Sequence, residues 1–150
     1  MRDQSQARMS CNVLIEEHDA DGLLVRTEEV RNLVVLTGRN LIRDLLGGLF
    51  SAPTHIAAGT DASPGSDSDT ALGAQVYADV ITRRVQGSSQ IKFQLFIPTT
   101  AANGNSLTEA GIQTIIGATT TLFARVTFPA FAKTLSNTLT LSWTINIASS

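Results

Sequence analysis

Apolar and polar residues alternate strictly near the end of the chain. A period of two is typical of a β-strand with one buried face. The pattern recurs over residues 121–128, so the stretch 107–147 predicts two long strands, led in by the polar residues 108–111. Pro129 and Lys133 are expected in the loop between them. In the last strand the two alternating sets are Leu139, Leu141, Trp143, Ile145 and Ile147, and Thr138, Thr140, Ser142, Thr144 and Asn146.

Shorter segments predict further strands, separated by residues that favour turns. Asp21-Gly22 and Asn103-Gly104 are good hairpin turns, because glycine adopts positive φ without a steric penalty. Residues 60–69 have the composition of a loop. Residues 70–78 fit either a helical turn or irregular chain. The additional strands are expected at residues 12–17, 23–27, 28–36, 55–59, 80–85 and 90–98, and the segment 111–116 precedes the two long strands.

One segment has the apolar spacing of a helix. Thr37 is a candidate N-terminal cap, and Gly47-Gly48 suits the C-terminal end. A helix over about 37–48 is therefore predicted, and we expect it to pack on a sheet. Its apolar positions are Leu41, Ile42, Leu45, Leu46 and Leu49.

These elements predict a mainly β protein, a two-sheet β-sandwich with one helix and an N-terminal hairpin or arm. Two packed sheets are expected because each strand has one apolar face to cover. Residues 1–10 are polar and unpatterned and are interpreted as an arm, and residues 11–150 as a single domain. A chain of this length buries roughly 68–70% of its unfolded surface, which is enough for a core.

Composition narrows the classes of partner. The formal net charge of −2 gives no basic surface for nucleic acid or an anionic membrane. Cys11 is the one cysteine, so no disulfide within the chain is possible. No secretory signal or apolar membrane span is expected. We therefore expect a soluble protein made in a cytoplasm, with no nucleic-acid or membrane partner.

Charge is distributed unevenly along the chain. After Gln86 the only charged residues are Lys92, Glu109, Arg125 and Lys133. A sheet face with hydroxyls instead of charges is poorly protected against pairing with neighbours. The face is either simply exposed or covered by another copy or another protein, and the low charge favours the covered state.

The sequence contains no convincing catalytic or metal-binding pattern. In the acidic loop 60–69, Pro64 interrupts the calcium-loop spacing and no closing Glu is present. His18 and His55 are far apart and lack neighbouring ligands, so a zinc site is not expected. Cys11 has no local base to activate it. We predict that the protein is not an enzyme and holds no metal or cofactor.

Glu109 and Arg125 are two rare charges in an apolar, hydroxyl-rich half of the chain. They are either solvated at strand ends or paired, with each other or with a neighbouring subunit. Because breaking a desolvated ion pair costs ~3–5 kcal/mol, we interpret them as candidate interface residues.

Several segments together resemble small structural virion proteins of tailed bacteriophages, including tail-collar and tail-fibre-like proteins. Gln113, after Ile112, departs from the aromatic residue common in that family. The Leu-rich helix and a closing strand of the Leu-x-Leu-x-Trp-x-Ile type are also part of the resemblance. The other segments are Asn32-Leu-Val-Val-Leu-Thr-Gly-Arg39, Pro53 to Gly59, Asp69-Thr-Ala-Leu72, Ala102-Asn103, Leu107-Thr-Glu-Ala-Gly-Ile112 and Leu122-Phe-Ala-Arg-Val-Thr-Phe128.

The resemblance implies a non-catalytic structural part of a virion, assembled in the host cytoplasm. A tail, baseplate or collar-fibre protein is expected, with itself, as a trimer or hexamer, and other virion proteins as partners. A capsid decoration (cement) protein is an alternative. A carbohydrate-binding adhesion module is another, which would need exposed aromatics such as Tyr77. Trp143 lies on the apolar face and is expected in the core.

Overall fold

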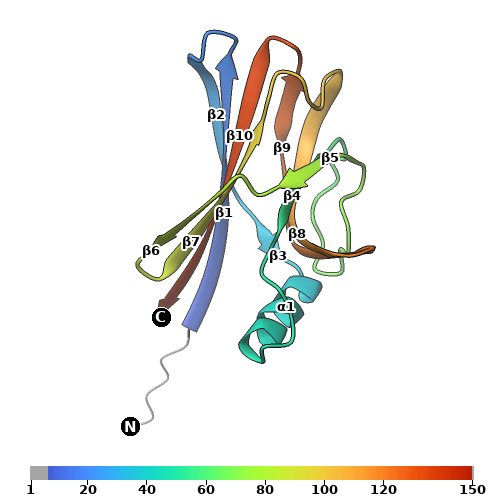
Figure 1. Cartoon of the computed structure of the whole chain (residues 1–150). Coiled ribbons are helices and arrows are strands. Elements are labelled where there is room, and N and C mark those ends of the chain that lie inside the picture. Colours follow the sequence, from blue (N-terminus) through green and yellow to red (C-terminus); the bar gives the residue numbers. More distant parts are fainter. Residues whose placement is uncertain (1–6, 150) are drawn as a thin grey trace.

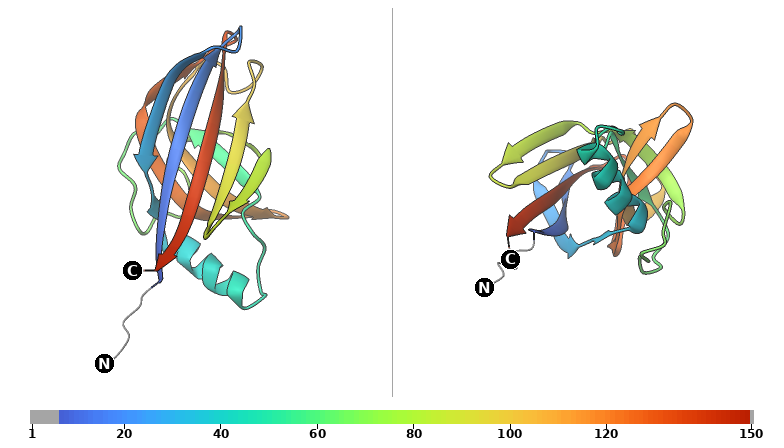
Figure 2. Two further views of the ribbon diagram at one scale, coloured as in Figure 1. Left: turned by 90° about the vertical axis from the view of Figure 1, so that its left-hand side faces the viewer. Right: turned by 90° about the horizontal axis from the view of Figure 1, so that it is seen from below.

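Residues 7–149 are described by the computed structural model, in which two five-stranded antiparallel sheets pack face to face (Figures 1 and 2). This confirms the predicted mainly β, two-sheet sandwich with one helix. The first sheet has the order β2-β1-β10-β7-β6 and the second β3-β9-β8-β4-β5. The strands are β1 (Ala7–Asp19), β2 (Leu24–Arg31), β3 (Leu33–Val34), β4 (His55–Gly59), β5 (Gln75–Val80), β6 (Arg83–Gly87), β7 (Gln90–Ile97), β8 (Asn105–Ile116), β9 (Thr119–Lys133) and β10 (Asn137–Ser149).

The core lies between the sheets, where alternating residues of each strand meet. In β10 the inward row contains Trp143, which is fully buried, and this confirms that the tryptophan belongs to the core. Ile56 of β4 and Ile112 of β8 are paired neighbours on the opposite sheet and are also fully buried. Burying such side chains stabilises the fold by about 1.5–3 kcal/mol each.

Helix α1 (Leu36–Leu46) closes one end of the sandwich and packs against β9 (Figure 1). Its bounds agree with the predicted helix to within two residues. The predicted capping role of Thr37 is wrong, because Val35 occupies the N-cap position and the Thr37 hydroxyl donates to the Leu122 carbonyl of β9 at 2.7 Å. No helix in residues 7–149 is long and apolar enough to cross a membrane.

The first hairpin follows the prediction at its turn. Gly22 adopts a φ of 82° between β1 and β2, and Asp19 accepts hydrogen bonds from the Asp21 and Leu23 amides at 2.9 Å. Strand β1 starts at Ala7 and pairs with the last strand, so part of the expected arm is a strand. The remainder of that arm, residues 1–6, lies outside the described residues.

Two predicted strands are wrong because the chain changes sheets within them. The segment 28–36 divides after Arg31: β2 pairs with β1, while β3 pairs with β9 in the other sheet. The segment 80–85 divides between Val80, the last residue of β5, and Arg83, the first of β6. The undecided segment 70–78 contains the start of β5 at Gln75.

The stretch 107–147 contains the two long strands that were predicted, β9 and β10, and a third, β8, which is longer than the expected segment 111–116. The polar residues 108–111 lie inside β8, and Pro129 and Lys133 lie inside β9, not in a loop. Both faces of β9 are covered over residues 122–126, all of which are buried. Simple alternation therefore cannot indicate where this strand begins or ends.

Candidate functional site

Glu109 and Arg125 lie on neighbouring strands, β8 and β9, on the face of the second sheet that points away from the core. Arg125 Nε donates to Glu109 Oε2 at 2.8 Å. The Glu109 side chain has no exposed surface and that of Arg125 is 4% exposed. The two residues therefore pair with each other inside one chain, and the alternative that each is solvated at a strand end is wrong.

The acidic loop, which in the structure extends from residue 60 to residue 74, covers this ion pair and supplies the remaining partners of Arg125. The guanidinium contacts Asp69 at 3.1 Å and Asp61 at 3.4 Å, and donates to the Ser63 carbonyl at 3.1 Å. Each nitrogen of the fork thus has an oxygen partner, which is the arrangement that favours arginine over lysine.

Glu109 holds the same loop through its backbone amides. Its carboxylate accepts hydrogen bonds from the Ala74 amide at 2.7 Å and the Gly73 amide at 3.0 Å, and from the Asp61 amide at 3.4 Å. A buried carboxylate with several N–H donors and a guanidinium partner is fully satisfied. The pair and the loop therefore form one clamp, which we call the Arg125 clamp.

The protonation states of the clamp follow from these contacts. Burial by itself would lower the pKa of Arg125, but the hydrogen bond and charge of Glu109, followed by those of Asp69, raise it above its usual value. Hydrogen bonds from Ser63, and then the charge of Arg125, lower the pKa of Asp61. Both groups therefore stay charged at neutral pH, and neither is poised to exchange a proton.

Small residues in the sheet allow the loop to lie close to it. Gly111 of β8 faces Leu72 of the loop and Leu122 of β9, whose side chains lie 2.8 and 3.0 Å from the position a Cβ would occupy. Leu72 is 8% exposed and so is the apolar anchor of the loop. The acidic loop, considered above as a calcium site, is thus seated by an ion pair and a leucine, and residues 7–149 hold no cluster of three or more potential metal ligands.

The other candidate residues occupy structural positions. Cys11 is buried against the core, and burial raises the pKa of its thiol to about 12, so it is not a nucleophile at neutral pH. His55 Nδ1 lies 2.7 Å from the Thr54 hydroxyl, which in turn accepts from the Ile115 amide at 2.9 Å. The role of Glu109 and Arg125 at a subunit interface remains a prediction. Both side chains are buried within the chain, so they would act on a neighbouring subunit through the loop they hold.

Sequence reasoning missed a buried lysine. Lys133, at the end of β9, is 1% exposed, and its ammonium donates to the Asn103 side chain and the Thr134 carbonyl, both at 2.9 Å. Burial lowers the pKa of this lysine. The signal was present in the sequence, because Lys133 lies two residues after the buried Phe131 and therefore on the same face of the strand.

The outer face of the first sheet contains the hydroxyl-rich side of β10, for which the sequence favours cover by another copy or another protein. On β10 it presents a row of hydroxyl and amide side chains that are partly or fully covered by their neighbours, and Gln94 of β7 donates to the Ser142 hydroxyl at 2.9 Å. Lys92 is the one charge on the outward side of β7, and Phe96 is 46% exposed there. The outward row of β10 comprises Thr138, Thr140, Ser142, Thr144 and Asn146.

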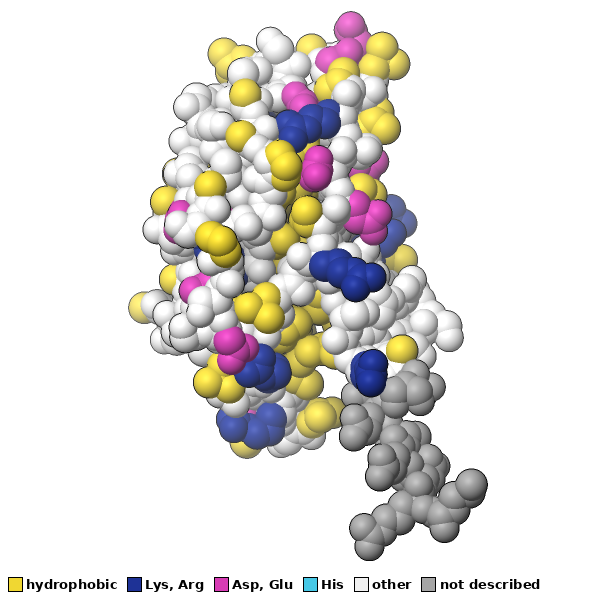
Figure 3. Space-filling view, turned by 180° about the vertical axis from the view of Figure 1, so that it is seen from behind, with side chains coloured by type: hydrophobic (Ala, Val, Ile, Leu, Met, Phe, Trp, Pro, Cys, Tyr) yellow, Lys and Arg dark blue, Asp and Glu magenta, His cyan; other side chains and the backbone are white. Residues whose placement is uncertain are grey.

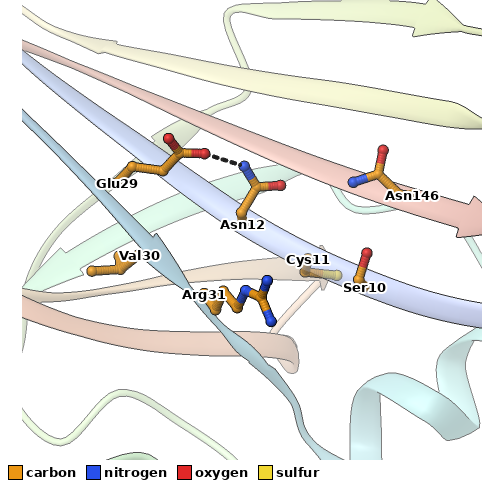
Figure 4. Close-up of a pocket in the computed structure, with 7 residues that line it drawn as sticks. All are labelled: Ser10, Cys11, Asn12, Glu29, Val30, Arg31 and Asn146. Atoms are coloured by element: carbon orange, nitrogen blue, oxygen red, sulfur yellow. Dashed lines mark hydrogen bonds between the residues drawn. The ribbon is translucent and has the colours of Figure 1, made fainter.

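A polar hollow of about 520 Å³ adjoins this face, where β2 diverges from β1 (Figure 4). Asn12 Nδ2 donates to Glu29 Oε1 at 2.8 Å within it. Arg31 and Asn146 line the same hollow from β2 and β10. The hollow therefore presents a carboxylate and a guanidinium at the side of the sheet.

No protein-family model matches the chain, and no curated protein or solved structure is significantly similar to it, so the function has to be inferred from the fold and from the surfaces described above.

Proposed function

We propose that this chain is a structural component of a tailed-bacteriophage virion, of the tail, baseplate or collar-fibre type. In this role it self-assembles and attaches to neighbouring virion proteins. The sequence resemblance supplies the biological setting. The surfaces of the sandwich supply the physical reason for self-assembly.

The observation that carries the proposal is the uncharged outward row of β10, at the centre of the outer face of the first sheet. This strand exposes no charged residue at all between Asn137 and Ala148. Interfaces between copies are depleted in charge at their centre, whereas the surfaces of monomers are usually rich in Lys and Glu. An ordered row of hydroxyls and amides can form hydrogen bonds with another copy. The free-energy cost of removing water from these groups is smaller than the cost for charged groups.

The buried ionisable groups give further support, because they are used to hold the structure. Glu109 and Arg125 fasten a loop, and Lys133 fastens the turn around Asn103. Each has its partners within the chain and would have to break them to act on a substrate. This use of buried charges to hold loops and turns in place fits a structural protein better than an enzyme.

Native mass measured across a dilution series tests self-assembly. A stable trimer or hexamer is expected. A monomer at high protein concentration would contradict the self-association part of the proposal. Mass spectrometry of purified phage particles tests the virion part, with the chain expected at a fixed ratio to other structural proteins; its absence from intact particles would contradict a virion role.

A further inference from the structure

The first sheet ends in two edge strands on opposite sides of the molecule. One of them, β2, is flanked by β9 at Arg26, whose guanidinium donates to the Ala130 carbonyl at 2.6 Å, while Glu29 further along the strand is exposed. β2 is the outermost strand on one side and β6 on the other (Figure 2, left view). All five residues of β6 are exposed. Each edge presents backbone N–H and C=O groups that can pair with a further strand.

The two ends of the sheet differ in charge, although the edge strand β2 is itself neutral, with Glu28 and Glu29 balanced by Arg26 and Arg31. The hairpin of β1 and β2, residues 7–31, has six carboxylates and three arginines, whereas β6 and β7 have three cations and no carboxylate. Side chains of both signs are visible over the β1–β2 half when the molecule is seen from behind (Figure 3). The carboxylates are Glu16, Glu17, Asp19, Asp21, Glu28 and Glu29, and the cations of the other edge are Arg83, Arg84 and Lys92.

One row of directly paired residues connects a cation on one edge to a carboxylate on the other. Across the sheet, Arg83 pairs with Gln94, Gln94 with Ser142, Ser142 with Leu14 and Leu14 with Glu29. Residues paired in this way lie on the same face. Arg83 and Glu29 therefore lie at the same level and on the same outer face, at opposite ends of the row.

Both residues have capacity for a new partner. Arg83 makes no side-chain hydrogen bond or ion pair within the described part of the chain, in contrast to Arg84, which donates to the Pro53 carbonyl at 2.8 Å. Glu29 uses one oxygen to accept from Asn12, and its other oxygen has no partner among residues 7–149. Glu29 also lines the polar hollow, which has room for a guanidinium (Figure 4).

The strand directions determine how two copies would join. In an antiparallel sheet of five strands, the first and the last run the same way. A rotation about an axis along the strands therefore brings β6 of one copy beside β2 of the next as a parallel pair, with Arg83 near Glu29. Contacts between two β6 edges would instead place arginine against arginine, and like charges suppress that arrangement.

We propose that the β2 edge, with the polar hollow beside it, is the docking site for the β6 edge of a second copy, and that Arg83 binds Glu29 across the contact. This inference rests on the proposed function and names the partner and the edges involved. Since the two contacting surfaces differ, the contact is head-to-tail, which closes into a ring when the rotation allows it.

Charge reversal at the two positions tests the contact. Arg83→Glu and Glu29→Arg are each expected to raise the dissociation constant of the assembly by about tenfold or more, and the variant with both changes to recover most of the loss. Arg43→Glu is the matched control, because it makes the same charge change on α1, where the side chain is 69% exposed. The control is expected to assemble like the wild type.

Cysteine cross-linking gives a second measurement, in a Cys11→Ala background. A chain with both Arg83→Cys and Glu29→Cys is expected to form a ladder of covalent oligomers on oxidation, and either single variant to stay monomeric under denaturing conditions. A cross-linked dimer of the Arg83→Cys variant would overturn the inference, because it requires two β6 edges in contact.

The outcomes also separate this inference from the proposed function. If the wild type assembles and both charge reversals behave like Arg43→Glu, the edge contact is overturned while self-assembly stands. If the wild type is a monomer at every concentration, the edge contact and the proposed self-assembly are both overturned.

Discussion

A charged side chain is retained inside a protein when each of its polar atoms finds a partner, and Arg125 meets that condition. Its three nitrogens contact Glu109, two aspartates and one carbonyl, although only 4% of its side chain is exposed. Removing such a residue leaves the partner charge buried and uncompensated. The clamp is therefore expected to be a sensitive point of the fold.

Arg125→Ala is expected to destabilise the protein by ~3–5 kcal/mol, because it leaves Glu109 buried without its counter-charge. Denaturant unfolding measures the loss, and Arg43→Ala, at an exposed arginine, is the control and should leave stability nearly unchanged. Native mass of the same variant tests the interface role. Unchanged stability together with unchanged mass would contradict both roles of Arg125.

Cys11 predicts a dependence of stability on alkaline pH. Burial raises the pKa of its thiol from 9.0 to about 12, so above pH 9 the unfolded chain loses this proton while the folded chain keeps it. The stability that this group contributes is complete below pH 9 and is lost between pH 9 and about 12. The difference in unfolding free energy between wild type and Cys11→Ala should therefore shrink over this range, and a constant difference would contradict the assignment.

At the scale of elements, α1 is positioned by how closely it approaches β9. A Cβ at Gly38 would overlap the carbonyl oxygen of Phe123, so only glycine allows the helix to lie this near to the strand. The resemblance segment Thr37-Gly38-Arg39 thus has a packing role at the start of the helix, where Thr37 also bonds the strand.

Gly38→Ala is expected to destabilise the fold by about 1–3 kcal/mol through overpacking, although alanine favours helices over glycine by about 1 kcal/mol. Gly47→Ala is the matched control, because that residue has a φ of −80° and the nearest atoms to its Cβ position lie 3.6 Å away. Thermal unfolding compares the two. Equal effects of both variants would contradict the close approach of α1 to the sheet.

The sequence predicted elements wherever one face was buried and the other was not. The alternation in β10 and the apolar stripe of α1 were recognised for that reason, and the Asp21-Gly22 turn because glycine tolerates a positive φ. Prediction failed where β9 is covered on both faces and where the chain changes sheets at Asn32 and after Val80. The pairing of Glu109 with Arg125 was one of the alternatives considered, but the role of the acidic loop was not foreseen, because it depends on residues more than 30 positions away.

At the scale of the whole molecule, assembly through charged edges implies sensitivity to salt. The Debye length falls from about 10 Å at 0.1 M ionic strength to about 3 Å at 1 M, so attraction between the β2 and β6 edges should weaken. The native mass of the wild type is expected to decrease as salt is raised, while Arg83→Glu should show a much smaller change. Assembly that strengthens with salt would instead indicate that apolar contacts dominate.

The pairing of the first and last strands has a mechanical consequence. Ala7 lies opposite Ser149 in the ladder that joins β1 to β10, and the ladder runs from there to Asp19 and Asn137. A tensile load applied at these two ends would open the ladder one residue pair at a time, like a zipper, instead of shearing all its hydrogen bonds together. The sandwich would therefore yield at low force when pulled by its two ends, whereas a load that passes sideways through the sheets would not open this ladder.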